Sequence, residues 1–168
     1  LAAAVGLADT EGLSALTMRR LARTLDVEAM SLYHHVSGKE DILDAMVDLV
    51  YAEIETPSPD DGWKPALRQR ARSMRSALLR HAWAISLMEA RRNPGPANLR
   101  HHDVVLGCLR TAGFSLAMTG HAYALIDAYT YGFAHEEITL PFDSPAETQA
   151  LASSILAELP ADDYPYLA

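Results

Sequence analysis

Apolar residues recur along this chain at helical spacing, which predicts an all-α fold of eight or nine helices. The clearest case is the stretch 63–80, where Leu67, Ala71, Met74 and Leu78 share one side, with Arg68, Arg72 and Arg75 elsewhere around the helix. No stretch shows the two-residue alternation of a half-buried strand. The other expected helices are 1–8, 18–25, 29–35, 82–91, 97–112, 115–136 and 145–159, together with one that begins after Ser37.

Capping and breaking residues place the ends of several of these helices. Thr17 is expected to cap the helix 18–25, and Ser37 with Glu40 has the pattern of a capping box. Residues 144–147 repeat that pattern with proline at the first helical position, and Gly113 is expected to end the helix 97–112 in the left-handed conformation. The segment 55–62 holds two prolines, a glycine and two aspartates and cannot continue a helix.

The segment 55–62 also marks a change of domain, with the preceding helix as the connector. We expect one helical domain over residues 1–46, with an incomplete first helix, and a second helical domain over residues 47–168. A chain of 168 residues suits this division into a small domain joined to a larger one.

Composition and charge narrow the class of protein. Hydrophobic residues make up 49% and charged residues 21%, as in globular proteins, and no apolar run approaches the ~20 residues of a membrane span. Cys108 is the single cysteine, and no signal-peptide pattern is present, so we expect a cytoplasmic protein with no membrane partner. The net charge of −8 argues against a protein that coats nucleic acid without sequence preference, because phosphate binding needs positive charge. Residues 17–39, however, hold four basic and two acidic side chains, so this segment is net positive.

The stretch 17–36 has the spacing of a helix-turn-helix. Its two short helices are separated by about three residues, too few for an antiparallel hairpin, so they must cross at a large angle. The apolar seam between them is expected to consist of Leu21, Ala22, Leu25, Val27, Leu32 and Val36. The second helix then exposes small or hydrogen-bonding side chains that suit a major groove. The alternative is a plain helical hairpin in which Tyr33 and His34 are half-buried packing residues.

The sequences 16–27, 31–36 and 39–44 resemble the DNA-binding domain of the TetR family of transcriptional regulators. That resemblance implies DNA contacts by Arg19, Ala29, Met30, Ser31, Tyr33, His34, His35 and Lys39, with Thr17 capping its helix and touching phosphate. Two departures are expected to matter. Asp26 stands where such turns commonly have glycine, and Ala29 and Met30 replace polar or proline contacts, so the operator sequence should differ from that of tetracycline repressors.

A weaker resemblance links the rest of the chain to the ligand-binding domain of tetracycline repressors. It is carried by Trp63, Leu67, Arg68, residues 77–79 and 113–116, and Gly132 with Glu136. The resemblance implies a repressor that binds palindromic operator DNA as a homodimer and is released by a small-molecule effector. Residues 1–46 are then the helix-turn-helix DNA-binding domain, and residues 47–168 are the helical effector-binding and dimerisation domain. The candidate effector contacts are Arg70, Met74, Trp83, Met88, Val105, Leu109, Met118, His121, Phe133 and Glu136.

Tetracycline itself is not expected as the effector. Arg70, Met74 and Val105 stand where the tetracycline repressors have polar and aromatic drug contacts. The helix 115–136 has one apolar stripe, which suits core or dimer packing, and it also carries His121, Tyr123, Asp127 and Tyr131, which suit a pocket.

Two other functional classes remain open on the residues alone: a helical-bundle enzyme, and a partner-binding module whose helix-turn-helix is structural. No Gly-x-Ser-x-Gly, P-loop or Gly-x-Gly-x-x-Gly motif supports an enzyme. No cofactor or metal is expected, because the spacing of the histidines fits no di-iron or zinc motif.

Overall fold

The computed structural model describes residues 1–58, 60, 62–90, 93–140, 144–160 and 164, and over these residues every regular element is helical. The all-α prediction is therefore confirmed. The elements are α1 (Ala2–Glu11), the 3₁₀ helix η1 (Leu13–Ala15), α2 (Met18–Thr24), α3 (Ala29–Leu32), α4 (Lys39–Glu53), α5 (Trp63–Arg80), α6 (Ala84–Ala90), α7 (Pro96–Thr111), α8 (Leu116–Thr139) and α9 (Pro145–Glu158). None of these helices is both long and apolar enough to cross a membrane.

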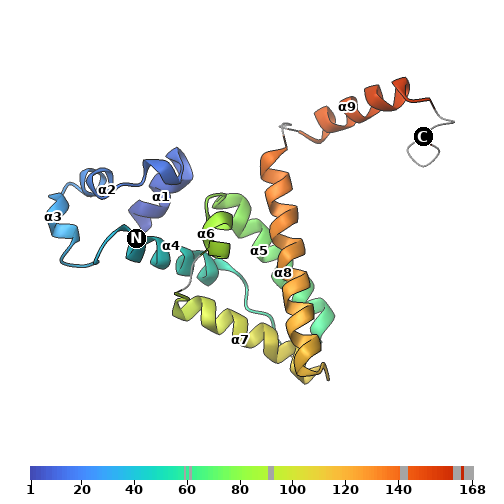
Figure 1. Cartoon of the computed structure of the whole chain (residues 1–168), viewed down its shortest axis with the longest axis horizontal. Coiled ribbons are helices and arrows are strands. Elements are labelled where there is room, and N and C mark those ends of the chain that lie inside the picture. The colour runs from blue at the N-terminus through green and yellow to red at the C-terminus, as the bar shows by residue number, and fades with distance from the viewer. Residues whose placement is uncertain (59, 61, 91–92, 141–143, 161–163, 165–168) are drawn as a thin grey trace. The chain divides into compact units, whose positions relative to one another are not determined.

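The chain forms two compact units, Leu1–Ile138 and Thr139–Ala168. In the first unit α4 packs against α1, α5, α6 and α7 (Figure 1). One hydrophobic core runs through this unit, from Leu7 and Leu21 near the amino terminus, through Met46 of α4, to Leu78 and Trp83. Because this core is continuous, the helices before α4 are packed onto the helices after it.

At the junction of α4 and α7, the carboxylate of Asp48 in α4 caps the N-terminus of α7. Asp48 of α4 accepts hydrogen bonds from the backbone N–H groups of Ala97, at 3.2 Å, and Asn98, at 2.8 Å, in the first turn of α7. A negative side chain is favourable at a helix N-terminus, where four N–H groups lack partners within the helix. Gly95 leaves the space for this carboxylate, since a Cβ there would lie 2.2 Å from Cγ of Asp48.

A smaller apolar cluster joins α5, α7 and α8. Leu67, Val105 and Leu109 are buried in it, and Tyr123 and Ile126 of α8 pack against them. In the second unit α9 begins at Ser144, whose hydroxyl accepts a hydrogen bond from the Glu147 N–H at 3.3 Å, so this half of the predicted capping box is formed.

Several predicted helix ends, and one predicted cap, differ from the structure. The first helix continues through residues 9–11, and the third ends at Leu32 because residues 33–35 form turns. The capping box of Ser37 with Glu40 is wrong: Gly38 precedes α4 without a side-chain cap. The Ser37 N–H instead donates to the Asp41 carboxylate at 2.7 Å, so Asp41 accepts the backbone hydrogen bond that Glu40 was expected to accept.

Candidate functional site

A tight turn between α2 and α3 sets the angle of the third helix. Thr17 caps α2 as predicted, since its hydroxyl accepts from the Arg20 N–H at 3.1 Å. Asp26 has φ 54°, the single positive φ outside glycine in the described chain, which is the left-handed conformation expected at a turn glycine. The Val27 N–H donates to the Ala22 carbonyl at 3.0 Å and closes the turn.

The side chains that follow this turn form an exposed face. Met30 is 72% exposed and Tyr33 47% exposed, and Ser31, His34 and His35 are also exposed. Leu32 points the other way and packs against the core. Tyr33 is therefore not the packing residue of a plain hairpin, and these side chains are available to a partner.

The residues flanking this face differ in their availability. Arg19 and Thr17 are exposed, and Ala29 and Lys39 are half-buried. Arg20 is paired with Glu11 of α1 at 2.6 Å, an ion pair that fixes α2 to α1. The structure thus places all nine predicted DNA contacts on α2, α3 and the segment up to the start of α4.

The predicted seam between α2 and α3 is partly wrong. Leu21 and Ala22 are buried, and Leu32 and Val36 pack against the core. The Leu25 and Val27 side chains are 45% and 44% exposed instead, because the short α3 is too small to cover both sides of the turn.

A buried polar cluster lies among α4, α5, α7 and α8. At its centre Arg70 of α5 is fully buried and donates through Nη1 to the Asp127 carboxylate of α8. Its Nε donates to Nε2 of His101 in α7 at 2.9 Å. A buried charge needs such partners, because burial without them costs several kcal/mol.

The Arg70 contact fixes the tautomer of His101. A guanidinium N–H can only donate, so Nε2 of His101 is the acceptor and the neutral ring carries its proton on Nδ1. Burial, the Arg70 charge and then His102 lower the pKa of His101 from 6.5 to about 4, so the ring is neutral at pH 7.

Three tyrosines border the cluster. The hydroxyls of Tyr51 in α4 and Tyr131 in α8 lie 3.2 Å apart, and burial raises the pKa of each. Burial also raises the pKa of the Tyr123 hydroxyl, and the neighbouring Asp127 raises it further. These phenols are therefore protonated donors over the physiological range.

Two buried atoms of this cluster make no hydrogen bond: Nη2 of Arg70 and Nδ1 of His101. Buried polar side-chain atoms in folded proteins are nearly always paired. Both atoms can donate a hydrogen bond at neutral pH.

The ten predicted effector contacts lie in four places. Arg70 is in the polar cluster, Met74, Trp83 and Met88 belong to the main core, and Val105 and Leu109 belong to the smaller apolar cluster. Met118, His121, Phe133 and Glu136 of α8 are exposed. Tyr51 and His101, which the sequence did not single out as effector contacts, join Asp127 and Tyr123 around Arg70. The signal for Tyr123 and Asp127 was the polar face of α8, which carries them four residues apart, whereas no sequence signal pointed to Tyr51 or His101.

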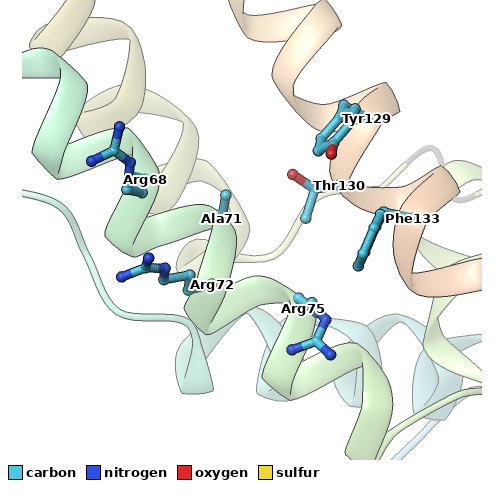
Figure 2. Close-up of a pocket in the computed structure, with 7 residues that line it drawn as sticks. All are labelled: Arg68, Ala71, Arg72, Arg75, Tyr129, Thr130 and Phe133. Atoms are coloured by element: carbon cyan, nitrogen blue, oxygen red, sulfur yellow. The ribbon is translucent and has the colours of Figure 1, made fainter. Parts of the chain in front are cut away.

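Phe133 lines a surface groove instead. The groove has a volume of about 200 Å³, and residues of α5 and α8 line it. Figure 2 shows Tyr129, Thr130 and Phe133 of α8 opposite α5, whereas the guanidinium groups of Arg68 and Arg72 point away from α8 in this view. The two aromatic rings stack with their centroids 6.0 Å apart. Arg75 also forms an ion pair with Glu137, with Nε to Oε2 at 2.7 Å. The groove and the buried cluster are thus two different places on α8.

A second polar network ties α1 to the helices after it. The Asp9 carboxylate of α1 accepts from Nε1 of Trp83 at 2.6 Å and lies 2.8 Å from Nδ1 of His81. Nε2 of His81 lies 3.2 Å from both oxygens of Glu53, at the end of α4. Arg80 pairs with the same Glu53 at 2.6 Å and lowers its pKa. We call Asp9, Glu53, His81 and Trp83 the Asp9 network.

Comparison with known proteins covers nearly the whole chain. Residues 1–46 match the family model of bacterial regulatory proteins of the tetR family, and residues 56–168 match the tetracyclin repressor-like C-terminal domain. The chain is 37% identical over 138 residues to the HTH-type transcriptional repressor DrrR1 of Streptomyces coeruleorubidus. That match takes in 81% of this chain and 51% of the repressor, so the chain spans about half the length of that relative.

Two solved structures have a similar fold and contain ligands. The TetR family protein ActR of Streptomyces coelicolor, in complex with actinorhodin, superposes with a TM-score of 0.85 at 30% identity, over 99% of this chain and 79% of that one. BioQ, bound to its double-stranded DNA operator, superposes with a TM-score of 0.72 at 31% identity, over 83% of this chain and 86% of that one.

Proposed function

The chain belongs to the TetR family of bacterial regulatory proteins, and we propose that it is a transcriptional repressor that a small molecule releases from DNA. In this proposal residues 1–46 bind a palindromic operator and residues 47–168 bind the effector and dimerise. The partner is chromosomal DNA, so the proposed location is the cytoplasm, and no catalytic residue, cofactor or metal is assigned.

The observation that carries the proposal is the exposed face of α3 and the turns after it. Ser31, Tyr33, His34 and His35 can donate hydrogen bonds to phosphate or base edges, and Ala29 is small enough for close approach. Arg19 and Lys39 flank the face as phosphate contacts, and Thr17 lies at the N-terminus of α2, where backbone N–H groups attract an anion. The operator complex of the similar BioQ supports this use of the fold.

Dimerisation is proposed through α8. Its exposed apolar residues include Leu116, Leu125 and Tyr129, which are 79%, 73% and 71% exposed. Exposed apolar stripes of this kind mark association surfaces. Two copies related by a two-fold axis would place two recognition helices about one helical turn of DNA apart, which accounts for a palindromic operator.

The effector is proposed to act through the polar cluster around Arg70, and the actinorhodin complex of the similar ActR supports an effector site in this fold. The cluster includes Tyr51 of α4, and α4 begins at Lys39 beside the DNA-binding face. A ligand that binds better to one arrangement of α4 shifts the population toward it. DNA binding then weakens only as far as the ligand prefers that arrangement.

The test is selection of DNA from a random duplex pool with the purified protein at two salt concentrations. We expect one palindromic motif, recovered less well at high salt because phosphate contacts release counterions. Recovery of no motif from a protein shown by mass to be a dimer would overturn the proposal.

A variant pair locates the contact surface. Tyr33→Ala should weaken binding to the selected operator at least tenfold while thermal stability stays within about 1 kcal/mol of the parent, as for other surface changes. Leu99→Ala removes an exposed apolar side chain from α7 and should leave operator binding unchanged. Unfolding of Tyr33→Ala, or equal operator binding by both variants, would contradict the placement.

A further inference from the structure

His81, which directly follows α5, has a carboxylate on each side of its ring. Nδ1 of His81 lies 2.8 Å from Oδ1 of Asp9 in α1, and Nε2 lies 3.2 Å from both oxygens of Glu53, the last residue of α4. His81 is 7% exposed, so bulk water does not compete freely for either nitrogen. Each ring nitrogen must therefore match the carboxylate that it faces.

The Asp9 side decides where one ring proton lies. Nε1 of Trp83 can only donate, and it donates to the same Oδ1 of Asp9 at 2.6 Å. That carboxylate oxygen accepts both bonds, so Nδ1 of His81 is the second donor. A neutral ring that keeps this bond to α1 carries its proton on Nδ1 and leaves a lone pair on Nε2.

The Glu53 side requires a second proton on the ring. The hydrogen bond from Arg80 lowers the pKa of Glu53, so this carboxylate is ionised at neutral pH and can only accept. A neutral His81 would direct the Nε2 lone pair at two carboxylate oxygens, whereas the imidazolium donates to them. Charge-assisted hydrogen bonds are roughly twice as strong as neutral ones. Both carboxylates are therefore satisfied together only when the ring carries two protons.

We propose that His81 is a proton-operated latch: its imidazolium joins α1 to the end of α4, and loss of the Nε2 proton as the pH rises releases Glu53 and weakens operator binding. Histidine suits this role because its charge commonly changes between pH 5 and pH 8. The effect on operator binding rests on the proposed function, whereas the latch itself is a property of the fold.

The groups around the ring give the latch its sign. Asp9 of α1 and Glu53 of α4 favour the imidazolium, and Arg80 at the end of α5 opposes it through its pair with Glu53. Trp83 is neutral, and its ring centroid lies 5.9 Å from that of His81. Two cations then balance two carboxylates, and loss of the ring proton leaves one negative charge in excess. Stability from the latch is present while the ring holds both protons and is lost as the pH rises.

Helix α1 carries the effect of the latch to the DNA-binding helices. Glu11 of α1 pairs with Arg20 of α2 at 2.6 Å, and apolar residues of both helices lie in one core. When Glu53 is released, α1 holds α2 less firmly in one position. More conformational freedom is then lost on binding DNA, which lowers the affinity. A rise in pH is therefore expected to weaken operator binding without any effector.

Glu53→Gln removes the need for the second proton, because its amide N–H can donate to the neutral Nε2 of His81. In urea unfolding of the full chain, we expect the unfolding constant of the parent to rise at least fivefold more than that of Glu53→Gln between pH 6 and pH 8.5. Glu55→Gln makes the same change of charge at a residue that accepts from Gln69 instead, and it should follow the parent within twofold. Equal pH dependence of the parent and Glu53→Gln would overturn the latch.

Nitrogen NMR of the imidazole rings tests the same step in the parent, even where Glu53→Gln fails to fold. The signals of His81 are identified by their loss in His81→Gln. As the pH rises from 6 to 8.5, Nε2 should lose its proton while Nδ1, bonded to Asp9, keeps its own. Loss of the Nδ1 proton instead, or a ring that does not change over this range, would overturn the proposal.

Operator binding tests the regulatory effect. His34 and His35 on the DNA-binding face also titrate, so the parent is compared with Glu53→Gln, which keeps both. Between pH 6 and pH 8.5 we expect the Kd of the parent for the selected operator to rise at least threefold more than that of the variant. Equal rises would overturn the control of DNA binding by the latch. Recovery of no palindromic operator would instead refute the proposed function, and the urea comparison would still decide the latch.

Discussion

The low pKa of His101 makes acid sensitivity a direct measure of the buried polar cluster around Arg70. The pKa of His101 is about 4 in the folded protein and 6.5 for an ordinary histidine. Between pH 6.5 and pH 4 the unfolded chain therefore binds a proton at this residue that the folded chain does not bind. Stability from this group is therefore complete above pH 6.5 and is lost as the pH falls toward 4. At 1.36 kcal/mol per pKa unit, the full loss is about 3 kcal/mol, and about 2 kcal/mol of it has occurred by pH 5.

The perturbation that isolates this term is His101→Gln. The glutamine amide oxygen can accept from Nε of Arg70 as the imidazole does, but glutamine does not titrate. Other titrating groups contribute alike to both proteins, so the difference between them reports His101 alone. Urea unfolding of parent and variant at pH 7.5 and pH 5.0 measures that difference.

We expect the parent to lose about 2 kcal/mol more than His101→Gln between these two pH values. The variant starts from a lower stability at pH 7.5 if its amide fits the site imperfectly, but that offset cancels in the comparison across pH. Equal losses in the two proteins would show that His101 ionises as easily when folded as when unfolded, and the buried neutral imidazole would be refuted.

Three further predictions concern stability and use the same urea assay. Gly95→Ala should lower the free energy of unfolding by about 1–2 kcal/mol, because the new Cβ displaces the Asp48 carboxylate that caps α7. Gly107→Ala, in the open middle of α7, should raise it by up to about 1 kcal/mol, and equal effects of the two variants would refute the close contact at Gly95. Asp26→Gly should gain about 0.5–1 kcal/mol, because glycine adopts φ 54° without a Cβ penalty, and a loss would show that the aspartate side chain stabilises the turn. Trp83→Phe removes the indole N–H that donates to α1 and should lose about 2–3 kcal/mol; a loss below 0.5 kcal/mol would show that this bond contributes little.

Local features of the fold could be predicted from the sequence because neighbouring residues determine them. The recurrence of Leu67, Ala71 and Met74 at spacings of four and three residues placed α5 over the residues that it occupies, and Thr17 caps α2 with its own hydroxyl. The cap of α4 was wrong because Glu40 and Asp41 are both acids in the first turn, and the choice between them depends on the path of the preceding chain.

The buried polar cluster around Arg70 could not be assembled from the sequence in the same way. Arg70 is 31 residues from His101 and 57 from Asp127, and only the packing of α5, α7 and α8 brings these side chains together. An arginine in an amphipathic helix usually lies on its solvated side, so the residue type gives no sign that this one is buried. Its position four residues before Met74, on the apolar side of α5, was the available hint.

The end of α4 connects the two halves of the proposed mechanism. Tyr51 is hydrogen-bonded to Tyr131 and contacts the ring of His101 in the buried polar cluster. Glu53, two residues later, faces His81 in the Asp9 network. Both residues lie in the last turn of one helix, so a ligand cannot move Tyr51 far without moving the Glu53 carboxylate. The Asp9 network includes Asp9 of α1, and apolar residues of α1 and α2 lie in the same hydrophobic core. The contacts at both places include hydrogen bonds, which weaken steeply when their geometry changes. A shift of α4 that alters the Tyr51 bond therefore tends to break bonds of the Asp9 network, and such breaking favours two distinct arrangements of the DNA-binding helices.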